Sequence, residues 1–211
     1  MIGVSDFERA LKLETERLCL DFTNTANWHA SAQPVEELPA YTDLVTWAQN
    51  VRLLTEAERQ RLKRQAARRP AEAKAVLARA HTLREAVYRL LSATAHRRAA
   101  NAADLDLINA ELALALAQAR LAPVAFGYAL HWPASPDALD CMLWPVVYSA
   151  ADLLAQPELL ARVGECADDR GCGYLFLDMT KNHSRRWCDM KDCGNRAKAR
   201  RHYERRKEEA Q

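Results

Sequence analysis

The chain has 211 residues, of which 49% are hydrophobic and 27% are charged, with only 6 Gly and 8 Pro. These values are ordinary for a globular protein and exclude a fibrous or largely disordered chain. The net charge of +2 is unevenly spread, because residues 181–207 hold 11 Lys and Arg against 3 Asp and Glu, a local balance of +8 that leaves −6 elsewhere. A basic end on a mildly acidic body predicts a polyanionic partner for that end.

The first 18 residues are charged and contain no apolar run of signal-peptide length. No run of about 18 apolar residues occurs, so no membrane contact is expected. We therefore expect a cytoplasmic protein. In that reducing compartment, cysteines are more often metal ligands or core residues than disulfides.

The first predicted element is a half-buried strand over residues 16–25, where apolar and polar residues partly alternate. A proline-containing loop over 26–40 follows. Apolar stripes then predict helices over 43–53, 56–68, 70–97 and 102–119. Their expected start signals are the caps Thr42 and Asn101, the Thr55–Glu58 capping box, and Pro70 in a first turn.

A change in composition marks residues 120–132, which are β-branched and aromatic around a central Gly and predict a hairpin. A helix over 138–155 should follow Asp137, with a kink or late start at Pro145. Residues 156–165 are expected to be a short helical or linking segment. Residues 1–160 are thus predicted to form a mainly helical α+β domain with a small antiparallel sheet.

Four of the six cysteines form the pattern C-x5-C-x15-C-x4-C, in residues 161–211, which we expect to form a second domain. Two close pairs at this separation predict a tetrahedral zinc site with the ligands Cys166, Cys172, Cys188 and Cys193. Zinc would supply on the order of 10 kcal/mol to a segment too small to fold by apolar burial. The alternative is that these cysteines are core or redox groups; Cys19 and Cys141 are expected in the core.

The segment between the cysteine pairs begins with an apolar run, Tyr174 to Leu177, suited to a strand, and Asn182 is a plausible turn residue. After Gly194 the sequence lacks Gly and Pro and favours a helix. Two short strands followed by a helix beside the last ligand are the order of a treble-clef-like finger.

The predicted last helix is basic and has few apolar residues, so it should project as a rod that binds nucleic-acid phosphate. Its first turn could enter a major groove, where Asn195 and Arg196 could contact bases. The stripe through Arg196 and Arg200 lies nearly opposite the stripe through Lys198 and Arg201. The expected DNA-binding residues are Arg185, Arg186, Asn195, Arg196, Lys198, Arg200, Arg201 and Arg205. The alternatives are a solvated charged helix or a protein-docking helix.

Polar residues gather at the end of the predicted first strand, in DFTNTANWH, residues 21–29. Polar groups beside an aromatic wall are typical of a small-molecule pocket. The candidate ligand-binding residues are Asp21, Asn24, Thr25 and Trp28. The alternative is structural, since Asp21 and Asn24 could fix a loop by bonding backbone amides.

The motif Cys193-Gly194-Asn195-Arg196, preceded by Arg186-Trp187-Cys188 and the stretch YLFLD, resembles the CGNR zinc-finger family. The stretch LCLDFTNT, residues 18–25, resembles the start of the ABATE domain that precedes this finger. The resemblance implies a bacterial, stress-related transcription regulator with a DNA-binding finger and an N-terminal domain that senses a small ligand. One departure is the first pair, which often has one residue fewer in the family; the extra residue here is Gly171.

The sequence therefore predicts a DNA-binding transcription regulator with zinc as its cofactor. Its alternative is a zinc-dependent adaptor for an acidic protein or RNA. No nucleophile-elbow, phosphate-loop or dinucleotide motif occurs, and four-cysteine zinc sites are usually closed, so no enzyme is expected. A third hypothesis makes the N-terminal domain a small-molecule enzyme. A palindromic DNA site would require a homodimer, although the chain shows no coiled-coil heptads.

Overall fold

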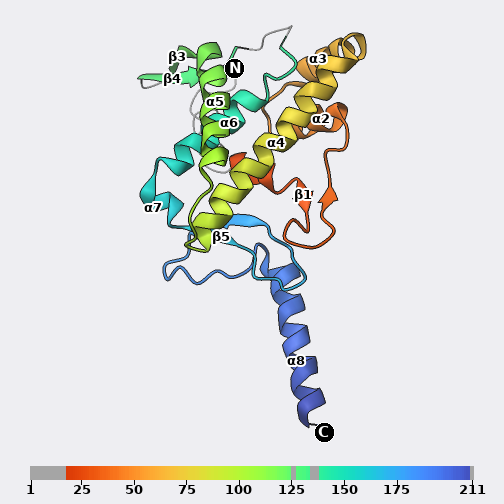
Figure 1. Ribbon diagram of the computed structural model, residues 1–211, viewed down its shortest axis with the longest axis vertical. Helices are drawn as coiled ribbons and strands as arrows, with labels where there is room; N and C mark the ends of the chain where they lie inside the picture. Colours follow the sequence, from red (N-terminus) through yellow and green to blue (C-terminus); the bar gives the residue numbers. More distant parts are fainter. Residues whose placement is uncertain (1–17, 125–126, 134–137, 210–211) are drawn as a thin grey trace.

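The computed structural model describes residues 18–124, 127–133 and 138–209. The described residues before 161 are called the body here, and residues 161–209 are called the finger. Figure 1 shows the helices of the body gathered in one mass, from which the last helix projects alone. Within the described residues, no helix is long and apolar enough to cross a membrane.

Helices make up most of the body. Residues 18–23 are helical. The helices that follow are α2 (Tyr41–Asn50), α3 (Glu56–Arg68), α4 (Pro70–Ala95), α5 (Ala102–Gln118), α6 (Leu143–Leu154) and α7 (Pro157–Leu160). Their apolar faces meet in one core, in which Phe22, Leu44 and Leu91 are fully buried. The long helix α4 crosses the body and ends near β5 (Figure 1).

Within the described ranges, three two-stranded antiparallel sheets accompany these helices. The first pairs β1 (Ala26–Asn27) with β2 (Val35–Glu36), and the second is the predicted hairpin, β3 (Arg120–Val124) with β4 (Gly127–His131). The third pairs β5 (Val163–Glu165) with β6 (Leu175–Leu177) in the finger. The π-helical turn η1 (Met190–Gly194) then leads into α8 (Asn195–Glu209). The predicted α+β class is confirmed.

Several predicted helix starts are confirmed. The Thr55 hydroxyl accepts from the Glu58 amide while the Glu58 carboxylate accepts from the Thr55 amide, and α3 covers the predicted residues. Asn101 caps α5 by accepting from the Ala103 amide, and Pro70 is the first residue of α4. Pro145 lies in the first turn of α6, where its missing N–H costs no helical hydrogen bond, so the late start is confirmed.

Two local predictions were wrong. Residues 18–23 are helical rather than a strand, because Leu18 and Phe22 face the core one helical turn apart and the Cys19 amide donates to the Ser149 hydroxyl. Thr42 does not cap α2; Ala40 precedes the helix, and its amide donates to the Asp43 carboxylate. The short helix expected within residues 156–165 is α7, and β5 follows it and pairs with β6. The predicted cap Asp137 lies outside the described residues.

Candidate metal centre and nucleic-acid interface

The four predicted zinc ligands meet at one point of the finger. Their Sγ atoms all lie within 4.8 Å of one another. The sulfur of Cys188 is 3.7 Å from that of Cys172 and 3.6 Å from that of Cys193. Four sulfurs at about 2.3 Å from a tetrahedral Zn²⁺ would be about 3.8 Å apart. The donor set and its compact spacing therefore fit a tetrahedral zinc ion.

Local hydrogen bonds position the cysteines. The Cys166 amide donates to the Tyr174 carbonyl at 2.9 Å, which extends the β5–β6 ladder to the first ligand. The Asp189 side chain caps η1 and accepts from the Lys191 amide. That turn buries Cys193 directly before α8. The metal centre thus joins the sheet of the finger to the start of the basic helix.

Without a bound cation, the four thiols oppose one another's ionisation, because neighbouring thiolate charges repel. Hydrogen bonds from Cys172 and Cys188 lower the pKa of Cys166, and donation to Cys166 raises the pKa of Cys188. Only part of the cluster can therefore ionise by itself. A divalent cation removes the conflict because it binds all four groups as thiolates.

The side chain of Arg196, in the first turn of α8, lies against the metal centre. Its Nη2 lies 2.9 Å from the Cys193 sulfur and 2.8 Å from an Asp168 oxygen, and its Nε also donates to Asp168 at 3.1 Å. Its remaining nitrogen, Nη1, pairs with Asp192. Burial would raise the pKa of Asp168, but hydrogen bonds from the Arg170 amide and Arg196 outweigh it and hold that pKa below its usual value. All three guanidinium nitrogens of Arg196 are thus engaged within the protein.

The turn between Cys166 and Cys172 fits closely against the body. Gly171 and Gly173 have φ of +86° and +69°, a region that favours glycine. A Cβ at Gly171 would stand 2.7 Å from the Ser31 backbone, and one at Gly173 would stand 2.6 Å from the Ala30 nitrogen. The extra residue of the first pair, Gly171, therefore closes the turn where a side chain would not fit.

The two charged stripes of α8 differ in their surroundings. Arg200 pairs with Asp169 of the first turn of the finger, as Arg196 pairs with Asp168. On the other stripe, Lys198, Arg201 and Arg205 are exposed. Among the side chains that the structure describes, no carboxylate is within ion-pair distance of these three. This second stripe, Lys198, Arg201 and Arg205, is called the free stripe here.

The other predicted DNA-binding residues have different surroundings. The Arg185 guanidinium donates to the carbonyls of Leu177, Trp187 and Cys188. It also lies 4.4 Å from the centre of the Phe176 ring. Arg186 is exposed beside the Trp187 ring. Asn195 is exposed, and its side-chain amide donates to the Lys191 carbonyl at 2.9 Å.

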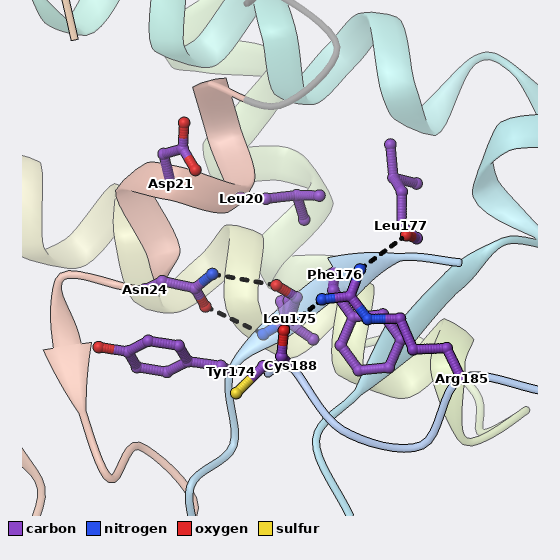
Figure 2. Close-up of a pocket in the computed structure, with 9 residues that line it drawn as sticks. All are labelled: Leu20, Asp21, Asn24, Tyr174, Leu175, Phe176, Leu177, Arg185 and Cys188. Carbon is purple, nitrogen blue, oxygen red and sulfur yellow. Dashed lines mark hydrogen bonds between the residues drawn. The ribbon is translucent and has the colours of Figure 1, made fainter. Parts of the chain in front are cut away.

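The candidate ligand-binding residues do not share one site. Asn24 forms two hydrogen bonds with the backbone of Leu175, as a paired strand residue would, at 3.0 and 2.9 Å. Thr25 is buried and accepts from Arg84 at 3.1 Å, and Trp28 lies beside the metal centre. Asp21 and Asn24 do line a shallow cavity of about 210 Å³ with Tyr174 and Arg185 (Figure 2). The contacts of Asn24 therefore fit the structural alternative, in which its side chain fixes the chain by hydrogen bonds to the backbone.

The sequence analysis missed the acidic pair Asp168-Asp169. These residues lie between the first two ligands and hold Arg196 and Arg200. Two adjacent carboxylates inside a basic finger were the available signal. Asp178 was also missed; its carboxylate accepts from the Thr180 and Arg185 amides and closes the loop before Cys188.

Comparison with known proteins agrees with this architecture. A family model described as ABATE, "Putative stress-induced transcription regulator", matches residues 16–157. A model described as the CGNR zinc finger matches residues 162–206. No curated protein matches the chain. These descriptions are of regulators and zinc fingers, not of enzymes. Because the first match covers well over half of the chain, the protein belongs to the ABATE family and carries a CGNR zinc finger.

Proposed function

We propose that this protein is a cytoplasmic regulator that binds duplex DNA through α8, with zinc holding the finger. The observation that carries the proposal is the free stripe, Lys198, Arg201 and Arg205, on a helix that projects from the body (Figure 1). Exposed cations at this spacing can neutralise successive phosphates. Arg186 adds an exposed cation beside the second cysteine pair.

The role proposed for Arg196 and Arg200 is to orient α8 and not to contact DNA. Each is already paired with a carboxylate of the first turn of the finger. Breaking these pairs to reach a phosphate would expose Asp168 and Asp169 to a negatively charged partner, which is unfavourable. Asn195 is exposed at the start of α8 and is the residue proposed to contact a base.

The proposed role of zinc is structural. Cys166, Cys172, Cys188 and Cys193 would complete its coordination shell, which leaves no open position for substrate. Bound zinc supplies folding free energy, while Arg196 donates to the Cys193 sulfur and offsets part of the charge of the thiolates. The finger is thereby held as a rigid base for α8.

We also propose that a small effector binds in the cavity between residues 20–24 and β6. Asp21, Asn24 and Arg185 contribute polar groups to its lining, and Phe176 contributes an aromatic wall (Figure 2). The cavity, at about 210 Å³, is smaller than common ligand pockets, so a bound molecule would have only a few non-hydrogen atoms. Ligands that raise the melting temperature of the wild type but not of Asp21→Ala would support this site.

The decisive experiment is a titration of the zinc-loaded protein with labelled duplex DNA at several salt concentrations, repeated after chelation. We expect salt-sensitive binding that is lost with zinc, because α8 then loses its base. No binding at low salt with zinc confirmed present would refute the proposal. Retention on RNA or an acidic protein instead would favour the adaptor function.

A further inference from the structure

A tryptophan of the body contacts two arginines of the finger. Trp28 follows β1 and has a positive φ of 55°. The guanidinium carbon of Arg170 lies 5.0 Å from the centre of its ring, and that of Arg196 lies 5.2 Å away. Both distances are within the range of cation–π attraction. The ring also packs against the buried cysteine cluster.

The two arginines belong to the parts of the finger that must be held together. Arg170 lies between the first two ligands, and its amide donates to Asp168 at 3.0 Å. Arg196 lies in the first turn of α8 and contacts Asp168 and the Cys193 sulfur. Trp28 therefore contacts the first turn of the finger and the basic helix simultaneously.

The body fixes the position of Trp28 through the next residue. The His29 amide donates to the Cys172 carbonyl at 3.0 Å. Its ring lies on that of Tyr88 with centres 3.6 Å apart, and its Nε2 is 2.8 Å from a Glu85 oxygen. Tyr88 and Glu85 belong to α4, the long helix at the centre of the body. A movement of α4 or of the loop at residues 28–31 would consequently move Trp28.

We propose that Trp28 is a positioning residue that couples the body to the metal centre and sets the direction of α8. A ligand or second subunit that favours one arrangement of the 28–31 loop would change how α8 is presented, because Arg196 follows the ring. The regulatory meaning of this coupling rests on the proposed function. The coupling itself is independent of DNA and is tested without it.

The first test compares the wild type with Trp28→Ala and Trp28→Phe as full-length, zinc-loaded proteins. Two partly exposed cation–π contacts change an equilibrium by about twofold to fivefold each, so Trp28→Ala should raise zinc transfer to a chromogenic chelator by about 4- to 25-fold. Amides in the first turn of α8 should exchange with deuterium faster by a similar factor. Trp28→Phe keeps an aromatic face and should stay within about twofold of the wild type.

Two further variants keep the test decisive. Arg170→Ala removes one of the two cation–π contacts of Trp28. The Arg170 side chain is 54% exposed, so this variant provides the answer if Trp28→Ala does not fold. Tyr128→Ala removes a 75%-exposed aromatic ring from the hairpin and should change neither measurement. Equal zinc transfer and exchange in Trp28→Ala and the wild type would overturn the proposal. Equal increases of zinc transfer and amide exchange in Trp28→Phe and Trp28→Ala would also overturn it, because the loss of the indole shape alone would then explain both effects.

A DNA titration separates this role from direct contact. Trp28→Ala should weaken binding at every salt concentration while leaving the log–log salt slope unchanged, because the ring neutralises no phosphate. A reduced slope would overturn the positioning role. If the wild type binds no DNA, the proposed function fails, and faster zinc transfer and exchange in Trp28→Ala would still support the coupling.

Discussion

Replacing Lys198, Arg201 and Arg205 together by Ala tests the proposed DNA-binding surface directly. The three side chains are exposed on the free stripe. The substitutions leave the pairs of Arg196 with Asp168 and of Arg200 with Asp169 intact. Ala is the strongest helix former, so α8 should persist and the change should be one of charge.

The expected magnitude follows from counterion release. Each phosphate neutralised on duplex DNA contributes about −0.9 to the slope of log K against log salt. About five contacts give a wild-type slope near −4 to −5, and removing three should bring it to roughly −2. If the two proteins bind equally at about 1 M salt, the variant should bind about 500-fold more weakly at about 0.1 M salt. Arg200→Ala alone should change the slope less than Arg201→Ala, because Arg200 already has a carboxylate partner.

The assay is fluorescence anisotropy with a labelled duplex between about 50 and 200 mM salt. A matched triple variant, Arg64→Ala, Arg68→Ala and Lys74→Ala, removes the same charge from exposed positions on α3 and α4. In Figure 1 α3 lies at the opposite end of the molecule from α8. The reasoning is refuted if both triple variants change the slope equally, or if the α8 variant leaves it unchanged.

Three further outcomes are expected. Arg196→Ala should lower zinc affinity by about 10- to 100-fold in a chelator competition, because Cys193 and Asp168 lose their shared hydrogen-bond donor. An unchanged affinity would contradict the role of Arg196 at the metal centre. Gly173→Ala should lower the free energy of unfolding by about 2 to 4 kcal/mol in a urea titration, because its Cβ would meet Ala30. Gly127→Ala, where the added Cβ meets open space, should lower it by about 1 kcal/mol. Equal losses would mean that the contact with Ala30 does not matter. Glu36→Gln should cost about 2 kcal/mol because it removes the carboxylate that pairs with two nitrogens of the buried Arg84 and leaves that guanidinium with Glu85. Burial opposes ionisation of Glu36, but Arg84 outweighs it and lowers its pKa from 4.5, so this stabilisation is present above about pH 4.5 and is lost as the pH falls through the lowered pKa. The stabilities of the wild type and Glu36→Gln should therefore converge in acid, and a constant difference down to low pH would contradict this reasoning.

Local signals predicted the helices of the body well. The capping box at Thr55, the cap at Asn101 and Pro70 at the start of α4 satisfy hydrogen bonds within a few residues, so neighbouring residues determine them. The strand predicted at residues 16–25 was wrong for a related reason. Its partial alternation is also compatible with one buried helical face, and the choice depended on distant partners such as Ser149.

The cluster of four cysteines could be predicted because cysteine spacing is itself the signal. A tetrahedral site needs two closely spaced pairs, and that requirement appears in the sequence as C-x5-C and C-x4-C. The roles of Arg196 and Trp28 could not be predicted in this way. Arg196 is 28 residues from Asp168, and Trp28 is far from both in sequence. Charge alone does not reveal which arginines already have a partner.

The sequence by itself determined the class of the protein, its cluster of four cysteines and the basic character of its last helix, because these depend on composition and on spacings of a few residues. Only the tertiary structure decided which face of α8 is open to a partner. It also decided that Asn24 and Trp28 belong to the contact between the body and the finger. The reason is physical: an ion pair, a ring contact or a strand-like hydrogen bond forms only when the fold brings distant residues within a few ångströms.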